Sequence, residues 1–306
     1  MRSGVLAGTF TLLIGSACVP STDEAERVFD ESSPMAAIQA EGTLVVAVPP
    51  DSPPFAFTAD SSDPQGFVVD LAQHLADDLG VEAEFVQAPS ERMAELVAGD
   101  ERREIGDQEA DVAFPLTTIT NQIYKVETGV LGFDVTTPYF VSHQRLLVAA
   151  GSGIHDVDDL AGLRVCSFVD PEVGVEVERL QPDAEVLEVS SSKECAVALD
   201  KGTADAAVAD EVDFLTMLAA LERRGGASGF EIVGEQATTQ GYSPYVVRGM
   251  AAFASSVFNE VKDDGRWLEA YEEWIAPLAG TDEVEAPPLT LEEAAVFYPD
   301  VTPPPE

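Results

Sequence analysis

Short apolar runs alternate along the chain with amphipathic stretches, a pattern typical of an α/β protein. The apolar runs predict strands at residues 44–48, 82–86, 111–116, 163–167, 184–189 and 205–209. The amphipathic stretches predict helices at residues 69–79, 90–98, 172–180, 192–200, 211–222, 251–263 and 265–276. Gly80 and Gly99 stand directly after two of these helical stretches, where glycine commonly ends a helix.

One pattern occurs once in each half of the chain. A helical stretch ends at a glycine, and an Ala-Asp pair then opens a buried strand. In the first half, residues 96–100 lead through an insert to residues 110–114, and in the second half residues 198–202 lead to residues 204–210. We therefore expect two similar lobes that face one cleft.

The strand predicted at 111–116 ends in a polar segment. Pro115 closes the apolar run, and Thr117, Thr118 and Thr120 follow it. Open α/β sheets hold their ligands at the carboxyl ends of the strands. The threonine hydroxyls and the free backbone N–H groups therefore mark a candidate binding crevice.

Six segments within residues 42–280 resemble, in order, the motifs of extracellular solute-binding proteins of ABC importers, family 3. Glutamate- and glutamine-binding lipoproteins are the most similar branch. The segments are the strand and loop at 44–57, GFVVDLA at 66–72, TIT at 118–120, TTPYF at 136–140, DAAVAD at 205–210, and DGRW at 264–267 followed by Tyr271 and Trp274. The resemblance implies a type II periplasmic-binding-protein-like α/β fold, with two lobes and a hinge of two crossing strands.

The expected organisation follows from this resemblance and from composition. Lobe 1 should cover residues 42–142, lobe 2 residues 143–244, and a return to lobe 1 residues 245–280. The two crossings are expected at 143–149 and 242–247, and they would permit hinge closure over a ligand. Residues 281–306 form an acidic, proline-rich tail that is expected to lie outside the fold.

The resemblance also implies a site for a small amino-acid-like solute between the lobes. It assigns Asp51, Phe55 and Phe57 to the first wall, Phe114, Leu116 and Thr118 to the floor of lobe 1, and Asp210 to the ligand's ammonium group. Structural alternatives stay open for several of these residues. One of the two phenylalanines at 55 and 57 fits the lobe core, Asp51 fits a turn between prolines, and Asp210 fits the N-cap of the helix at 211–222.

Two departures from the family pattern concern the ligand's carboxylate. Ile123 stands where the family has a carboxylate-clamping arginine, and Lys125 is the nearest cation in sequence. The facing loop of lobe 2 contains Asp170, Pro171 and Glu172, and proline removes an N–H donor while the acids occupy the positive end of the following helix. A cleft lined by these acids, with Asp51 and Asp210, favours a cationic or otherwise atypical solute.

The chain carries 56 acidic and 16 basic residues, for a formal net charge of −40. This charge repels nucleic acid and anionic lipid, and so argues against both as partners. Two interpretations stay open. One is adaptation to a salty medium, where charge repulsion is screened, and the other is a generally acidic secreted protein.

Residues 1–17 have the pattern of a signal peptide. Arg2 precedes an apolar stretch at 5–14 that is too short to span a bilayer. Cys18 follows small residues, as at a lipoprotein processing site, although Gly15 replaces the leucine common there. Lipidation of Cys18 would anchor the chain at the outer face of the cell membrane, with residues 18–41 as a flexible tether. Secretion after Ala17 is the alternative.

Cys166 and Cys195 form the remaining cysteine pair, and an exported chain with such a pair favours a disulfide. The resemblance implies the same pairing, since glutamate- and glutamine-binding relatives carry a cysteine pair at matching places in lobe 2. Two buried free thiols are the alternative. Ser191 and Glu194 predict a capping box at the start of the helix that carries Cys195.

The expected function is capture of a small polar solute, amino-acid-like or a cationic amine, for an ABC permease, by an extracytoplasmic monomer. A binding-type fold kept for sensing or protein interaction, without transport, is the alternative. An enzyme is not expected, because no motif for an activated nucleophile is found. No cofactor or metal is expected either, since the histidines are scattered at His74, His143 and His155.

Overall fold

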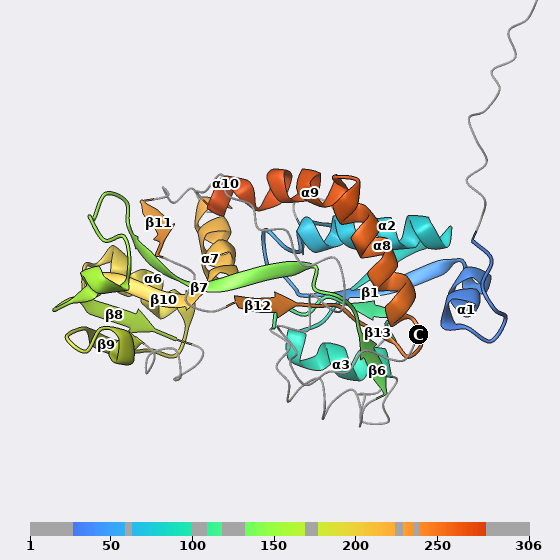
Figure 1. Cartoon of the computed structure of the whole chain (residues 1–306), viewed down its shortest axis with the longest axis horizontal. Coiled ribbons are helices and arrows are strands. Elements are labelled where there is room, and N and C mark those ends of the chain that lie inside the picture. Colours follow the sequence, from blue (N-terminus) through green and yellow to red (C-terminus); the bar gives the residue numbers. More distant parts are fainter. Residues whose placement is uncertain are drawn as a thin grey trace, which may run out of the picture.

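The computed structural model describes residues 27–58, 63–98, 109–117, 132–168, 177–223, 229–234 and 239–279. Within these residues the chain forms two main sheets with helices packed on them, arranged one after the other along the long axis (Figure 1). We call the part built on the five-stranded sheet lobe 1 and the part built on the six-stranded sheet lobe 2. The two-lobed α/β fold expected from the sequence is confirmed.

Lobe 1 contains a mixed sheet with helices on both faces. Its strands are β1 (Thr43–Val48), β4 (Glu82–Gln87), β5 (Val112–Ala113), β6 (Phe133–Val135) and β13 (Tyr245–Val247). Its helices are α1 (Pro34–Glu41), α2 (Phe67–Leu79), α3 (Ser90–Ala98), α8 (Ala251–Asp263), α9 (Arg266–Trp274) and α10 (Ala276–Ala279). The strand order is β4-β1-β5-β13-β6, and β1 runs parallel to β4 and β5. A short hairpin of β2 (Phe57–Thr58) and β3 (Pro64–Gln65) follows β1.

Strand β1, which lies between β4 and β5, is buried on both faces, as is typical of parallel strands between helical layers. Leu44, Val46 and Val48 pack in the cluster that includes α2, α8 and α9. Ala47 points to the opposite face and packs in the cluster that includes α3. This packing fixes the direction of β1, whose carboxyl end leads into the proline-rich loop at residues 49–54.

Lobe 2 contains a second sheet of the order β11-β7-β10-β8-β9, with β12 paired to β7. Its strands are β7 (Phe140–Ala149), β8 (Arg164–Ser167), β9 (Glu185–Glu188), β10 (Ala206–Asp210), β11 (Phe230–Val233) and β12 (Thr239–Tyr242). Its helices are η2 (Val157–Leu160), α6 (Ser192–Asp200) and α7 (Glu211–Arg223). β8 runs parallel to β9 and β10, so the carboxyl ends of these strands share one edge.

Strands β7 and β12 connect the lobes (Figure 1). Residues 140–143 of β7 pair with β12, and the following residues of the same strand pair with β10 and β11 of lobe 2. The return crossing was expected at 242–247, yet Tyr245 already pairs with Ala113 in the lobe 1 sheet. The return crossing is therefore β12, slightly earlier in the chain.

Part of the segment expected to be a flexible tether is instead helical. Ser33 caps α1 by accepting a hydrogen bond from the Ala36 N–H, Pro34 stands at the first helical position, and Gly42 ends the helix with a left-handed backbone. Ile38 is buried in the lobe 1 core. These local signals and the core contact make residues 34–41 a part of the fold.

The repeated Ala-Asp pair has the same structural role in both lobes. The Asp111 N–H donates to the Val45 carbonyl, and its Oδ2 accepts from the Val45 N–H at 2.8 Å. Asp205 makes the same two bonds with Arg164, and there the N–H to Oδ2 distance is 2.9 Å. Each aspartate thus joins the start of its strand to the neighbouring parallel strand.

Across the described part of the chain, none of the helices combines the length and the apolar character needed to cross a membrane.

Candidate functional site

Asp210 is the last residue of β10 and lies where that strand meets the crossing strand β7. Its Oδ1 accepts hydrogen bonds from the hydroxyl of Ser142 and, at 3.0 Å, from the N–H of Val212 in the first turn of α7. The N-cap role left open by the sequence is therefore real, because Val212 is the second residue of the helix. That role uses one of the two carboxylate oxygens.

The other oxygen, Asp210 Oδ2, is buried and has no hydrogen-bond partner among the described residues. The Tyr242 hydroxyl faces the same carboxyl and lowers its pKa by hydrogen bonding, although its geometry leaves Oδ2 without a full hydrogen bond. Burial raises the pKa of the Asp210 carboxyl, and the hydrogen bonds from Ser142 and Val212 oppose that rise. A buried carboxylate oxygen without a donor is costly, which makes it a candidate acceptor for a bound cation.

Asp213 adds a second carboxylate one helical turn after Asp210. Residues three apart in a helix are neighbours on one face. Burial, together with the charge of Asp210, raises the pKa of Asp213 to about 7. Burial and both carboxylates raise the pKa of Tyr242 well above its ordinary range. The end of β10 is thus a region where negative charge is concentrated and poorly solvated.

The first wall expected from the sequence is already in contact with lobe 2. Asp51 is exposed, and its Oδ1 accepts from Arg223 Nη1 at 2.7 Å. The guanidinium of Arg223 also lies over the ring of Phe57, 4.9 Å from the ring centroid. Phe57 in turn makes an edge contact with Trp274, with ring centroids 5.8 Å apart.

The other aromatic candidates lie in the lobe 1 core. Phe55 is fully buried and packs edge-on against Phe67 and Phe140. Phe114 is also fully buried and packs against Tyr139. Neither side chain exposes surface to a solute in this structure, because each is enclosed by other rings. The alternative that one of Phe55 and Phe57 belongs to the core therefore applies to Phe55.

Leu116 lies partly buried at the end of the segment that follows β5, and its N–H donates to the hydroxyl of Ser90 at 3.0 Å. Several other sequence candidates lie outside the described residues: Cys18, Thr118, Ile123, Lys125, Asp170, Pro171 and Glu172.

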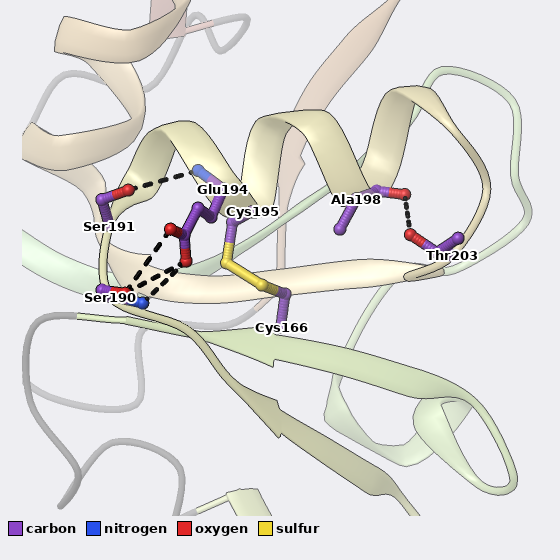
Figure 2. Close-up of a disulfide and its surroundings, with 7 residues drawn as sticks. All are labelled: Cys166, Ser190, Ser191, Glu194, Cys195, Ala198 and Thr203. Atoms are coloured by element: carbon purple, nitrogen blue, oxygen red, sulfur yellow. Dashed lines mark hydrogen bonds between the residues drawn. A yellow bond between two sulfur atoms is a disulfide. The ribbon is translucent and has the colours of Figure 1, made fainter.

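Cys166 and Cys195 form a disulfide, so the pairing expected from the sequence is present (Figure 2). The bond joins β8 to the first turn of α6, and both cysteines are fully buried. The capping box takes a shifted form. The Ser191 hydroxyl accepts from the Glu194 N–H at 3.4 Å, but the Glu194 carboxylate accepts from the N–H of Ser190 rather than Ser191.

A depression of about 580 Å³ lies on a different part of lobe 1. Its lining includes Thr43 and Glu82, the first residues of the parallel strands β1 and β4. Ligands of open α/β sheets bind at the opposite, carboxyl ends. The depression is therefore not the expected crevice. No group of three or more potential metal ligands is found among the residues that the structure describes.

The structure also brings forward residues that the sequence patterns did not single out. Ser142 and Tyr242 come from the two crossing strands, and Asp213 was detectable only as an acid three residues after Asp210. Arg223 gave no local signal, because its partner Asp51 is 172 positions away in the chain.

Comparison with known proteins finds relatives of this chain among solute-binding proteins. The ABC transporter glutamine-binding protein GlnH of Bacillus subtilis is 29% identical over 280 residues, covering 88% of this chain and 95% of its own length. The L-cystine-binding protein TcyJ of Escherichia coli is 34% identical over 130 residues, 42% of this chain and 44% of its own.

Solved structures show the same fold. A mutant of ArgBP from T. maritima has 25% identity and a TM-score of 0.54, with 79% of this chain and 99% of that chain covered. An ancestral arginine-binding protein bound to arginine has 26% identity and a TM-score of 0.53, with 76% and 98% covered. The profile of bacterial extracellular solute-binding proteins, family 3, matches residues 44–277. The chain therefore belongs to family 3 of the bacterial extracellular solute-binding proteins.

Proposed function

We propose that this protein captures an amino-acid-like solute with a protonated amine, and that Asp210 accepts the hydrogen bonds of that amine. Membership of the family makes the chain an extracytoplasmic solute-binding protein that works with an ABC permease. Family membership favours this function over a sensing or interaction module without transport. The observation that carries the choice of an amine is the buried, unpartnered Oδ2 of Asp210.

The physical argument concerns the state of Asp210 before binding. A carboxylate accepts hydrogen bonds, and a charged N–H donor forms the stronger type of bond with it. Oδ1 is already satisfied by Ser142 and Val212, so a solute amine would bind Oδ2, next to the Tyr242 hydroxyl that also interacts with the carboxyl. Asp213 adds negative potential at the same place once the pH exceeds its pKa of about 7. A second positive charge on the solute would be favoured for that reason.

The names of relatives are consistent with this proposal. GlnH is named for binding glutamine and TcyJ for binding L-cystine, and each of these amino acids has an ammonium group. The ancestral protein with the same fold was solved with arginine and also with glutamine. These names support amino-acid chemistry, and the acidic end of β10 supports the cationic members of that class.

The remaining site residues are proposed from the sequence together with their positions. Phe57 and Asp51 would form the first wall of the site. Leu116 and Thr118 would form its floor, and Asp170 would contribute from the facing loop of lobe 2. Phe55 and Phe114 would act from the core, behind the solute-facing surface. We also propose that Cys18 carries a lipid anchor and that the protein acts as a monomer. Labelling cells with a radioactive fatty acid tests the anchor, because a Cys18→Ser variant should lose the label.

A ligand panel tests the proposed solute class. Isothermal titration calorimetry would compare glutamate, glutamine, cystine, lysine, arginine and putrescine on the purified protein. We expect the tightest binding for lysine or arginine, and a loss of about 30-fold or more for Asp210→Asn, because removing one member of a buried charge pair costs several kcal/mol. Asparagine keeps a carbonyl oxygen for the Val212 N–H, so the helix cap survives.

A matched control separates the effect of losing a hydrogen bond to Asp210 from the effect of losing its charge. Ser142→Ala removes the other hydrogen bond to Oδ1 but leaves the carboxylate charge, so it should weaken binding much less than Asp210→Asn. Tight binding of glutamate alone, or equal affinities for wild type and Asp210→Asn, would overturn the proposal. Binding of none of the six compounds would instead favour the interaction module.

A further inference from the structure

Arg223, the last residue of α7, reaches from lobe 2 to lobe 1. Its Nη1 donates to Asp51 Oδ1 at 2.7 Å, and its guanidinium carbon lies 4.9 Å from the centroid of the Phe57 ring. Asp51 and Phe57 belong to the loop and short strand that follow β1, at the carboxyl edge of the lobe 1 sheet. The contact therefore links the helix after β10 to the segment after β1.

The register of α7 explains why Arg223 faces lobe 1. Val212 and Leu215, near the start of this helix, pack in the core cluster of lobe 1 together with Phe140 and Tyr242. Arg223 comes eleven residues after Val212, which is about three helical turns at 3.6 residues per turn. The two residues therefore lie on nearly the same face. α7 thus contacts lobe 1 near both of its ends, through apolar residues at its start and through the guanidinium at its last residue.

The chemistry of the contact suits a guanidinium. A planar guanidinium can donate to a carboxylate and lie over an aromatic ring at the same time, which an ammonium does less well. Trp274 makes an edge contact with the Phe57 ring, and Trp274 is itself held on lobe 1 by a hydrogen bond from its Nε1 to Asp70 Oδ2 at 2.7 Å. Arg223 therefore meets an ordered surface.

The net negative charge of the whole chain makes a cation at this position between the lobes important. With 56 acidic and 16 basic residues, both lobes carry excess negative charge and repel each other. A cation placed between the lobes offsets part of that repulsion. The ion pair is exposed, since the side chains of Arg223 and Asp51 keep 40% and 79% of their accessible surface. Its effect is accordingly modest and sensitive to salt.

We infer that Arg223 is a positioning residue for solute capture: it joins lobe 2 to the Asp51–Phe57 segment of lobe 1 and favours the arrangement in which the lobes are together. This inference rests on the proposed solute capture only for its effect on affinity. It also assigns the carboxylate of Asp51 to Arg223. A cationic solute would then depend on the acids at the end of β10 for its charge partner.

The test uses a readout that needs no solute. Spin labels at the exposed positions Glu41 in lobe 1 and Asp200 in lobe 2 would report the distance between the lobes by pulsed electron resonance. Both sites would be changed to cysteine in the full chain, with Cys18→Ser and the native disulfide intact. For Arg223→Gln we expect the ratio of short to long distances to fall about three- to tenfold, because an exposed ion pair and a cation–π contact are lost.

Arg164→Gln is the matched control. Arg164 also pairs with an aspartate, Asp205, at 2.9 Å, and the two arginines are similarly exposed, at 37% and 40%, but Arg164 and Asp205 both belong to lobe 2. This variant should leave the distance distribution unchanged. A similar shift in both variants, or no shift in Arg223→Gln, would overturn the inference.

Two further variants separate charge from stacking. Arg223→Lys keeps the charge but loses the planar group, so it should give an intermediate distribution. Phe57→Leu removes the ring and keeps the ion pair, so it should also give an intermediate distance distribution. If Arg223→Lys matched Arg223→Gln while Phe57→Leu matched wild type, the two-part contact described above would be wrong.

Affinity for the best solute of the panel provides the second readout. We expect Arg223→Gln to weaken it by a factor similar to the shift in the distance ratio, mainly through faster dissociation, because the competent arrangement is less populated. A shift in distances without measurable binding of any solute would keep the interlobe role and refute only the proposed function. A shift in distances with tighter binding would contradict the positioning role.

Discussion

At the scale of single residues, the same aspartate position is used twice with different electrostatic outcomes. Asp111 and Asp205 each accept a backbone N–H from the neighbouring strand. Burial raises the pKa of Asp111, whereas hydrogen bonds from the Arg164 side chain lower the pKa of Asp205. The residue on the neighbouring strand, Val45 in one lobe and Arg164 in the other, decides whether the pKa of the aspartate is raised or lowered. A sequence repeat can therefore conserve a structural role while the pKa shifts of the two carboxyls have opposite directions.

Asp213 allows a direct prediction of pH dependence. Its pKa is about 7 in the folded protein against an ordinary value of 3.8, so between these pH values the folded state holds a proton that the unfolded state has lost. Its contribution to stability is fully present below pH 3.8 and is lost as pH rises to about 7. The Asp213→Asn variant has no carboxyl to ionise at this position, so it does not lose this stability as the pH rises. We expect it to be more stable than wild type by roughly 2 to 4 kcal/mol at pH 8, with little difference at pH 4.

Urea unfolding of both proteins at several pH values between 4 and 8 measures the difference. Asp210 and Tyr242 face Asp213, and both remain in each protein, so the comparison isolates one carboxyl. Asp200→Asn, at the exposed end of α6, serves as the control and should show no such trend. A stability difference that is the same at pH 5 and pH 8 would refute the role assigned to burial.

The sequence predicted some individual residues better than others, for physical reasons. Asp210 was identified through the segment DAAVAD at 205–210, because the resemblance of this segment to the family motif assigns Asp210 to the ligand's ammonium group. Phe55 was not separable from Phe57, because residues two apart in a strand point to the same face. In the structure Phe55 lies in a turn and only Phe57 belongs to β2. The pairing of Arg223 with Asp51 depends on how two lobes meet. No local pattern contains that information.

At the scale of elements, Gly66 shows why one motif glycine is needed. It precedes α2 with φ of 130° and ψ of 175°, a region that is essentially restricted to glycine. A Cβ there would lie 2.5 Å from the Phe55 carbonyl oxygen and 2.7 Å from that of Pro54. We expect Gly66→Ala to lower the free energy of unfolding by roughly 3 kcal/mol or more, measured by urea denaturation.

Gly80 at the other end of α2 is the matched comparison. Its φ is 72°, but an added Cβ would meet nothing within 4 Å. Gly80→Ala should therefore cost only about 1 kcal/mol, from the left-handed backbone alone. Equal losses for the two variants would show that the close approach at Gly66 has no energetic weight.

The disulfide gives a second prediction at this scale. Cys166 and Cys195 are 29 residues apart in sequence, and closing a loop of this length is expected to stabilise the fold by roughly 3 to 4 kcal/mol through the unfolded chain. The double variant Cys166→Ala with Cys195→Ala should lose about this much in urea unfolding. Wild type treated with a reducing agent is the control and should lose a similar amount. A loss below about 1 kcal/mol in both would contradict a structural role.

Most element positions were predictable because local signals and burial agreed. The helix at 192–200 begins and ends as expected, and α2, α3 and α8 match closely. β5 is shorter than the apolar run predicted, since only Val112 and Ala113 satisfy strand pairing. Helix α1 was missed because it is short and its apolar residues, which make up most of PMAAIQAE, do not gather on one face, so that packing against lobe 1 decides its structure.

At the scale of the whole molecule, a net charge of −40 governs how the protein responds to salt. Most carboxylates have no basic residue to pair with, because acids outnumber bases 56 to 16. Their repulsion acts over about 10 Å at 0.1 M salt and about 3 Å at 1 M. We expect the melting temperature to rise by several degrees between 0.05 and 1 M NaCl, as measured by scanning calorimetry.

A charge variant tests whether repulsion causes this rise. Changing six exposed acids to glutamine takes the formal charge from −40 to −34, and Glu41, Glu82, Glu91, Asp200, Glu269 and Glu272 are suitable positions. Because repulsion grows with the square of the charge, the salt dependence should fall by roughly a quarter. A slope that does not change would assign the salt effect to hydrophobic burial instead. Wild type that unfolds below about 0.1 M salt would favour adaptation to a salty medium, whereas a folded state that persists there would favour a generally acidic exported protein.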